Sequence, residues 1–189
     1  VPLMAFHRLC ADLSMQFPLL KLTIINGSRD DISNLVQSGK AQIGVLFHSG
    51  RLDDSLEFYP IGRFEQTLIV APSHTLANIP APTLAELAPF RQLVICDKRG
   101  EGRDQPLTAN HWYIDSYFYM TELVIAGLGW ALIPDHVANS DWYRSDLVRL
   151  STQHIHGKMQ VEVGLVKRAD HGPGIVLTWL MARITQVFR

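Results

Sequence analysis

The stretch from Leu123 to Pro134, which reads LVIAGLGWALIP, constrains the fold of this chain more than any other. An apolar helix is predicted to run up to Gly127, because glycine readily takes the left-handed conformation that ends a helix. Two residues later a short, fully apolar strand begins, and the proline ends it. Ser116 is the predicted N-cap of the helix, and 112–114 is a predicted strand. A strand, a helix and a strand joined by short turns predict that the two strands pair in parallel, with a right-handed crossover.

The same alternation of helices and strands runs through the rest of the chain. Apolar residues recur at helical spacing in 3–17 and in a final helix that opens at Pro173. Shorter helices are predicted at 29–38, with Ser28 as N-cap, and after Thr83. The segment 97–110 is unpatterned and is predicted to be a long loop. Further strands are predicted at 20–25, 43–47, 56–61, 67–71, 93–96, 147–150 and 161–166, which together indicate an α/β fold with parallel sheets.

Composition narrows the class of protein. The 189 residues suit one large domain or two small lobes, and 47% hydrophobic residues can form a sizeable core. No apolar run reaches the length of about 18 residues that spans a membrane, and the start of the sequence does not resemble a signal peptide. We therefore expect a cytoplasmic protein. The net charge of −1 argues against direct DNA binding, because a domain that grips a phosphate backbone usually carries a basic excess.

The sequence carries no motif of a common enzyme or metal site. Gly127-x-Gly129 follows a helix, whereas a dinucleotide-binding loop follows a strand and opens a helix. His154-x-His156 has no accompanying cysteines or carboxylates. We therefore predict no catalytic residue, no metal and no cofactor. Cys10 and Cys96 lie in apolar segments and are predicted to be buried free thiols, with a redox-sensing pair as the alternative.

Several segments resemble, in the same order, the effector-binding domain of LysR-type transcriptional regulators. Residues 126–134 resemble the family's AAGLGIALLP. Residues 38–47 resemble its G-x-L-D-x-A-I turn and strand, with Gln42 in place of the usual acidic residue. Residues 68–77 resemble its LVLPADHPLA, with Thr75 in place of the proline. Smaller similarities lie at Phe17-Pro18, 83–87 and 147–150.

The resemblance implies a fold like that of a periplasmic binding protein, with two Rossmann-like lobes joined by two crossover strands. We place lobe 1 at 1–70 and 164–189 and lobe 2 at 71–163. Cys10 and Cys96 then fall in different lobes, which argues against a redox pair. In the family a further strand and a Ser/Thr-bearing loop precede the first helix; either they lie upstream of the printed residues or the resemblance ends there.

The resemblance also implies partners. The winged helix-turn-helix domain that reads DNA would lie outside this chain. Antiparallel homodimers or tetramers would form through helices 3–17 and 117–126, with Met4 and Met15 off the core face of the first helix. Both methionines are equally compatible with ordinary exposed helix positions.

Four segments could form a ligand site. In open α/β sheets ligands bind at the carboxyl ends of strands beside helix N-termini, where free N–H groups favour an anion. The resemblance implies a small effector in the cleft between the lobes. The basic residues near this site would suit a carboxylate or phosphate and are Arg29, Lys98, Arg99 and Arg103. The four segments are 26–28, 47–48, 97–99 and 115–117. Within them, the predicted effector-binding residues are Asn26, Gly27, Ser28, Phe47, His48, Asp97, Arg99, Ser116 and Tyr117.

Simpler interpretations of the same residues stay open. In these interpretations, Ser28 and Ser116 would be plain helix caps, 97–99 a solvated loop, and His48 an ordinary loop histidine.

At the level of the whole chain, the main hypothesis is the effector-sensing domain of a LysR-type regulator. One alternative is a secreted, monomeric solute-binding protein for a small anion. A second is an enzyme such as a porphobilinogen deaminase relative, which would need clustered arginines or a cofactor cysteine.

Overall fold

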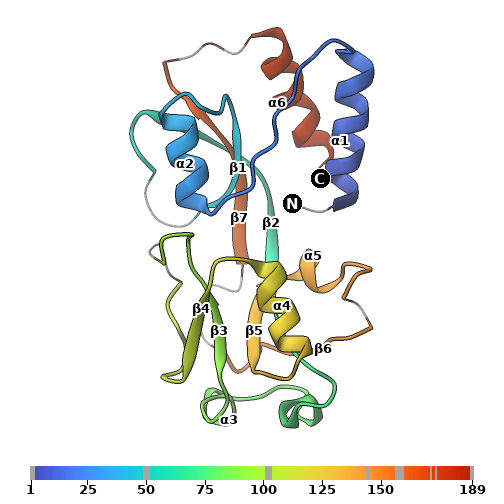
Figure 1. Cartoon of the computed structure of the whole chain (residues 1–189), viewed down its shortest axis with the longest axis vertical. Coiled ribbons are helices and arrows are strands. Elements are labelled where there is room, and N and C mark those ends of the chain that lie inside the picture. Colours follow the sequence, from blue (N-terminus) through green and yellow to red (C-terminus); the bar gives the residue numbers. More distant parts are fainter. Residues whose placement is uncertain are drawn as a thin grey trace. The chain divides into compact units, whose positions relative to one another are not determined.

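The chain divides into two compact units, which are shown in Figure 1. The computed structural model describes residues 3–48, 52–100, 104–143, 145–155, 160–170, 172 and 174–187. Unit 1 comprises Val1–Arg63 and Glu162–Arg189, and unit 2 comprises Phe64–Val161. The boundaries fall inside the two long strands β2 (Leu56–Val70) and β7 (Gln160–Arg168), whereas the sequence placed them at 70/71 and 163/164.

In its described residues, unit 1 combines three helices with the ends of the long strands. Its other elements are α1 (Leu3–Gln16), α2 (Arg29–Gln37), β1 (Gly44–His48) and α6 (Ile175–Val187). The strand β1 pairs antiparallel with β7, with Gly44 opposite Val166. Val36 of α2 packs into a buried cluster with Leu46, Leu56 and Val166. The helix α1 packs on α6, where Arg183 Nε donates to Asp12 Oδ2 at 2.8 Å and the Phe17 ring meets Trp179 edge-on.

The predicted strand at 20–25 does not form, which corrects the sequence analysis. These residues follow α1 as coil (the blue segment between α1 and α2 in Figure 1), and Leu22, Ile24 and Ile25 are half exposed. An apolar segment becomes a strand only where a neighbouring strand takes up its backbone hydrogen bonds. Among the described residues β1 stands at the end of the strand order beside β7, and no strand pairs with 20–25.

Unit 2 is built on a mixed sheet. Both β4 (His111–Ile114) and β5 (Trp130–Pro134) pair parallel with β3 (Gln92–Ile95), so β3 separates them. The two strands are parallel, as predicted, but they are not neighbours. The end of β2 pairs antiparallel with β5 and with β6 (Val148–Leu150), which makes the sheet mixed where the sequence predicted parallel strands. The remaining elements are η1 (Thr75–Asn78), α3 (Leu84–Leu87), α4 (Tyr117–Ile125) and α5 (Asp135–Ala138).

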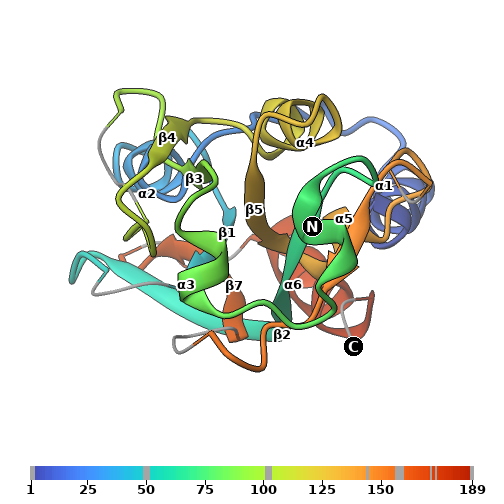
Figure 2. The same cartoon turned by 90° about the horizontal axis from the view of Figure 1, so that it is seen from below.

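The two faces of this sheet hold separate cores. Alternate residues of β5 point to opposite faces, because successive side chains of a strand alternate. Ala131 and Ile133 pack with Met120 and Val124 of α4, whereas Trp130 packs with Leu87 of α3. Figure 2 shows α4 and α3 on opposite sides of β5. The indole Nε1 of Trp130 donates to the Leu87 and Phe90 carbonyls at 3.2 and 3.3 Å, which satisfies the polar atom of a fully buried ring.

The structure requires glycine at two positions of the turn between α4 and β5. Gly127 has a φ of +77° and donates to the Val124 carbonyl at 2.8 Å, while Leu128 donates to the Leu123 carbonyl at 3.0 Å. These two bonds end the helix in a Schellman motif. A Cβ built on Gly129 would lie 2.2 Å from the Arg91 carbonyl oxygen, so only glycine fits there. The predicted helix, turn and strand are confirmed.

The strands predicted at 56–61 and 67–71 form one continuous strand, β2. No turn interrupts this strand after Gly62. Side chains in its middle contact β7: Arg63 Nη2 lies 3.6 Å from Glu162 Oε1, and Gln160 Nε2 donates to Glu65 Oε1 at 3.4 Å. The other predicted helices and strands form within a few residues of their expected bounds. None of the helices in the described ranges combines the length and apolarity that crossing a membrane requires.

Candidate functional site

The segment before α2 forms a closed capping box. Asp31 N donates to Ser28 Oγ at 3.2 Å, while Asp31 Oδ2 accepts from Ser28 N at 3.0 Å and from Ser28 Oγ at 2.9 Å. The serine has an extended backbone with φ −66° and ψ 171°, as an N-cap requires. The predicted capping role of Ser28 is therefore confirmed, and aspartate is long enough to close the box.

Asp31 also covers Gly27. A Cβ built on Gly27 would lie 2.9 Å from the Asp31 Cβ, so the two residues are already in contact. Gly27 was predicted to contact the effector, but a carboxylate of the chain lies beside it. The adjacent Arg29 donates from Nη1 to Asp30 Oδ1 at 2.8 Å, while Asn26 is exposed. Both features expected to attract an anion, the helix N-terminus and Arg29, already have an internal carboxylate partner.

The end of β1 places one aromatic and one histidine side chain. Phe47 is partly buried and His48 is exposed, with the imidazole stacked on the Phe58 ring of β2 at 4.6 Å and an angle of 29°. This stacking fixes the His48 ring against the sheet. The contact fits the simpler interpretation of a packed strand-end histidine as well as it fits a ligand contact.

In unit 2 the segments that follow β3 and β4 leave the sheet together. Ile95 and Ile114 are register partners, and Cys96 N donates to the Ile114 carbonyl at 3.0 Å. The chain then turns at Asp97, whose buried carboxylate accepts from Arg99 N at 3.0 Å. Asp97 therefore shapes the loop, while Lys98 and Arg99 are exposed. Arg103 lies outside the described residues.

The N-terminus of α4 differs from that of α2. Ser116 is its N-cap residue, but its side chain makes no capping hydrogen bond, and the first turn holds no acidic residue. The prediction that the Ser116 hydroxyl accepts a first-turn N–H is therefore wrong. Its φ of −142° and ψ of 126° depart from the Ser28 conformation that brings a hydroxyl onto the helix end.

Asp104 and Tyr117 form a second feature beside this helix end. Asp104 N donates to the Ile95 carbonyl at 3.1 Å, which returns the loop to the end of β3. Burial of its carboxyl raises the pKa of Asp104, although the residue as a whole is exposed. Burial, together with the nearby Asp104 charge, raises the pKa of Tyr117 well above its usual value, so the phenol stays protonated and can donate. Asp104 was not predicted as a site residue, because the loop around it has no sequence pattern that marks one residue.

The predicted site residues thus fall into two groups. Asn26, Gly27, Ser28, Phe47 and His48 belong to unit 1, and Asp97, Arg99, Ser116 and Tyr117 belong to unit 2. Unit 2 offers the Ser116 hydroxyl, the Tyr117 phenol, the Asp104 carboxyl and the first-turn N–H groups of α4. Such groups can hydrogen-bond a small polar molecule. In the part of the chain that the structure describes, no three His, Cys, Asp or Glu side chains gather as a metal site would need. Cys10 and Cys96 lie in different units and form no disulfide with each other. Cys96 is buried as predicted, whereas Cys10 is only partly buried, so the prediction of a buried thiol is wrong for Cys10.

The chain consists of two α/β units that two long strands connect, and each unit has polar segments at the ends of its strands. This architecture is typical of two-unit small-molecule-binding domains. Residues 3–189 match the family model described as the LysR substrate binding domain, and the chain belongs to that family. The resemblance predicted from the sequence is confirmed.

The relatives are transcriptional regulators. The chain is 29% identical over 162 residues to the HTH-type transcriptional regulator cbl of Escherichia coli (strain K12), covering 79% of this chain and 49% of the relative. It is 22% identical over 126 residues to the HTH-type transcriptional regulator AceR of Acinetobacter baumannii, covering 66% and 42%. The chain therefore spans less than half the length of these curated relatives.

Solved structures share the fold. The effector binding domain of QuiR in complex with shikimate aligns with a TM-score of 0.77 at 15% identity, covering 96% of this chain and 88% of that one. The cofactor-binding domain of the Cbl transcriptional regulator aligns with a TM-score of 0.74 at 21% identity, covering 94% and 80%. The predicted α/β fold class, like that of periplasmic binding proteins, is confirmed.

Proposed function

We propose that this chain is the effector-sensing domain of a bacterial, cytoplasmic LysR-type transcriptional regulator. The match of residues 3–189 to the family model carries the proposal. Family membership and relatives that are named as regulators favour it over a secreted solute-binding protein. They likewise favour a binding role over the porphobilinogen deaminase-like alternative.

Strand-end segments within each unit are proposed as candidate effector contacts. From unit 1 these are Asn26 to Ser28, Phe47 and His48, and from unit 2 they are Asp97 to Arg99, Ser116 and Tyr117. The α4 end supports this assignment best, because Ser116 and the first-turn N–H groups have no side-chain cap there. We add Asp104, whose carboxyl lies near Tyr117.

Sensing requires that the effector prefer one of two arrangements of the protein. A ligand shifts an equilibrium only by its differential affinity for the two states. The effector would therefore bias the arrangement of the units, and DNA-binding domains outside this chain would report the change.

A thermal-shift screen of the domain against small acids, polyols, aromatics and amino acids tests the proposal, with shikimate included because a structural neighbour binds it. A ligand at 100 times its dissociation constant stabilises by about 2.7 kcal/mol. The variant Ser116→Ala should fold normally, because its hydroxyl makes no cap bond, and should reduce the shift caused by a hit.

Thr83→Ala is the matched control for the serine variant. Thr83 caps α3 through Glu86, so its loss should cost about 1 kcal/mol of stability and leave the effector shift unchanged. A hit that ignores Ser116→Ala would contradict the proposed site. A screen without a hit would contradict the sensor function for the ligand classes tested.

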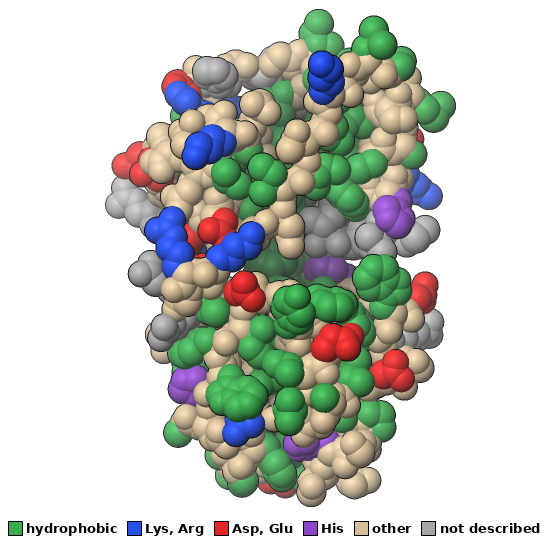
Figure 3. All heavy atoms as spheres, viewed as in Figure 1, with side chains coloured by type: hydrophobic (Ala, Val, Ile, Leu, Met, Phe, Trp, Pro, Cys, Tyr) green, Lys and Arg blue, Asp and Glu red, His purple; other side chains and the backbone are tan. Residues whose placement is uncertain are grey.

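The proposal includes a homodimer that uses α1 and α4. The inner face of α1 buries Leu9 and Leu13, while Met15 is 81% exposed; the side chain of Met4 lies outside the described residues. On α4, Phe118 and Tyr119 are 50% and 62% exposed. Apolar side chains gather over α4 in Figure 3, which supports a protein contact on this helix.

A further inference from the structure

We propose that Asp31 is a specificity-determining residue that excludes anionic groups from the unit 1 part of the effector site. This inference rests on the proposed function, because it concerns the ligand that the same segments would bind. It replaces the expectation that the Asn26 to Ser28 segment attracts a carboxylate or phosphate.

The first observation is the position of the Asp31 carboxylate. One of its oxygens, Oδ2, accepts from both Ser28 N and Ser28 Oγ, and the Asp31 Cβ lies against Gly27. The free N–H groups and dipole of a helix N-terminus favour a negative charge. Here the helix carries its own negative charge at that point, bound to the N–H and the hydroxyl of the N-cap residue Ser28.

The second observation concerns the neighbouring cation. Arg29 is the basic residue nearest to this segment in the sequence, and its Nη1 donates to Asp30 Oδ1 at 2.8 Å. The first turn of α2 therefore holds two carboxylates and one guanidinium, a net negative charge. A ligand carboxylate entering here would meet one carboxylate already bound to Ser28 and another already paired with Arg29.

The two helix ends of the proposed site consequently differ in charge. The first turn of α4 carries no acidic residue, whereas that of α2 carries two. We infer that an effector presents hydrogen-bond donors, such as hydroxyl or amine groups, toward Asp31.

Inorganic sulfate serves as the probe, so the test needs no identified effector. Backbone amide NMR shifts of residues 27–31 are followed during sulfate titration at constant ionic strength. The native domain should show no saturable shift there. Asp31→Asn removes the charge and should give a saturable shift of these amides, with a sulfate affinity at least about tenfold above the upper limit that the native titration sets.

Two further variants separate position from charge. Asp30→Asn removes the same charge one residue away, outside the capping box, and should leave these amides insensitive to sulfate. Asp31→Glu keeps the charge and places the usual acid of a capping box at this position, so the amides of residues 27–31 should again not respond to sulfate. Circular dichroism and a thermal melt of each variant establish that it is folded before titration.

Three results would overturn the inference. They are saturable sulfate binding at these amides in the native domain, an equal gain in Asp30→Asn, and no gain in a folded Asp31→Asn. These outcomes do not depend on the effector screen. A gain confined to Asp31→Asn would support the role of Asp31 even if that screen failed, and failure here would leave the Ser116 test of the proposed function intact.

Discussion

At the residue scale, burial changes the pKa of a titratable side chain, and His136 is the clearest case. His136 is the second residue of α5, and its side chain is only 15% exposed. The ring meets Phe64 edge-on, with centroids 5.1 Å apart, and Nδ1 lies 3.8 Å from Asp135 Oδ1. Burial lowers the pKa of His136 to about 4, although the Asp135 charge acts in the opposite direction.

This shift predicts a pH-dependent stability. Because the folded pKa lies below the unfolded value of 6.5, the unfolded chain binds the proton more readily between these values, so stability falls as the pH drops below 6.5. Between pH 7 and pH 5 the loss should be about 2 kcal/mol. Urea unfolding at each pH measures it, and His136→Gln should remove most of the dependence. An unchanged slope in that variant would contradict the assignment to His136.

The window above pH 5 separates the titration of His136 from that of the carboxylates whose pKa is lowered. Hydrogen bonds from Ser55 lower the pKa of Asp53, the hydrogen bond with Lys167 lowers that of Glu57, and those with Thr83 lower that of Glu86. Groups of this kind stabilise the fold above their unfolded pKa and lose that contribution only at more acidic pH. His74, whose pKa burial also lowers, acts in the same direction as His136 and remains in the variant.

At the element scale, the turn from α4 to β5 determines how unit 2 is assembled. The Schellman motif at Gly127 turns the chain, and the close approach of Gly129 to the Arg91 carbonyl brings β5 beside β3. Trp130 N then donates to the same carbonyl at 2.9 Å, and the strand enters the sheet with Trp130 on one face and Ala131 on the other.

Gly129→Ala should therefore be strongly destabilising. The added methyl would overlap a backbone oxygen that cannot move without disturbing β3, so we expect a loss of about 3 kcal/mol, at the upper end of overpacking effects. Gly172→Ala is the control, because a Cβ there meets nothing within 4 Å, and it should change stability by less than about 0.5 kcal/mol. Equal effects of the two substitutions in urea unfolding would show that the approach is not tight.

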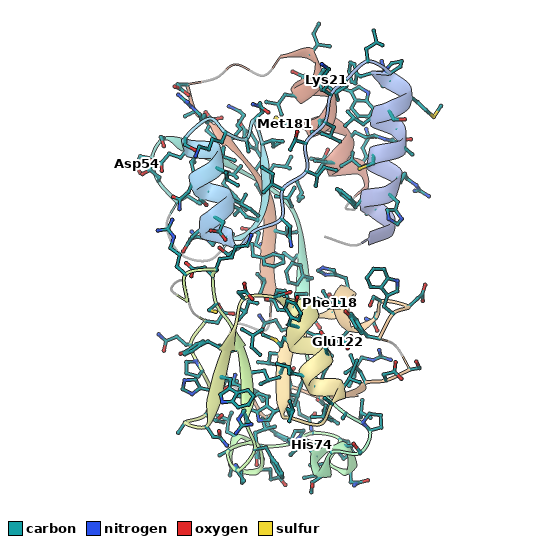
Figure 4. All side chains as sticks on the ribbon, in the orientation of Figure 1. Lys21, Asp54, His74, Phe118, Glu122 and Met181 are labelled. Carbon is teal, nitrogen blue, oxygen red and sulfur yellow. The ribbon has the colours of Figure 1, made fainter. Side chains whose placement is uncertain are left out.

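At the scale of the whole molecule, each unit exposes a helix that the proposed homodimer would cover. Figure 4 shows Phe118 and Glu122 on the same side of α4, and the ring of Phe118 is half exposed. Its aromatic neighbours are Tyr119 and Tyr143, with centroids 5.5 and 6.4 Å away. Aromatic side chains of this kind commonly dominate the energy of protein interfaces.

Phe118→Ser should weaken the proposed dimer with little effect on folding. Loss of one central aromatic residue is expected to raise the dimer dissociation constant at least about tenfold, which light scattering after size-exclusion chromatography would detect across a dilution series. Ile175→Ser, at an 83% exposed position of α6, is the matched control and should leave the dimer intact. A native domain that is monomeric throughout, or equal weakening by both variants, would contradict the interface.

The sequence by itself determined those features that depend only on residues close together in the chain. Hydrogen bonds between near neighbours fixed the capping boxes at Ser28 and Thr83 and the glycine end of α4, so these were predictable from spacing alone. The family and its α/β fold were also predictable, because the order of several local segments carries that information.

Only the tertiary structure decided which strands are neighbours and which polar groups are already occupied. The segment 20–25 has a strand pattern but no partner, and β3 separates the strands that flank α4. The Asp104 carboxyl lies near enough to Tyr117 to raise its pKa only because the intervening loop returns to the end of β3. Strand pairing and burial depend on residues distant in the sequence, so a local pattern can indicate a strand or a polar site but cannot specify what lies beside it.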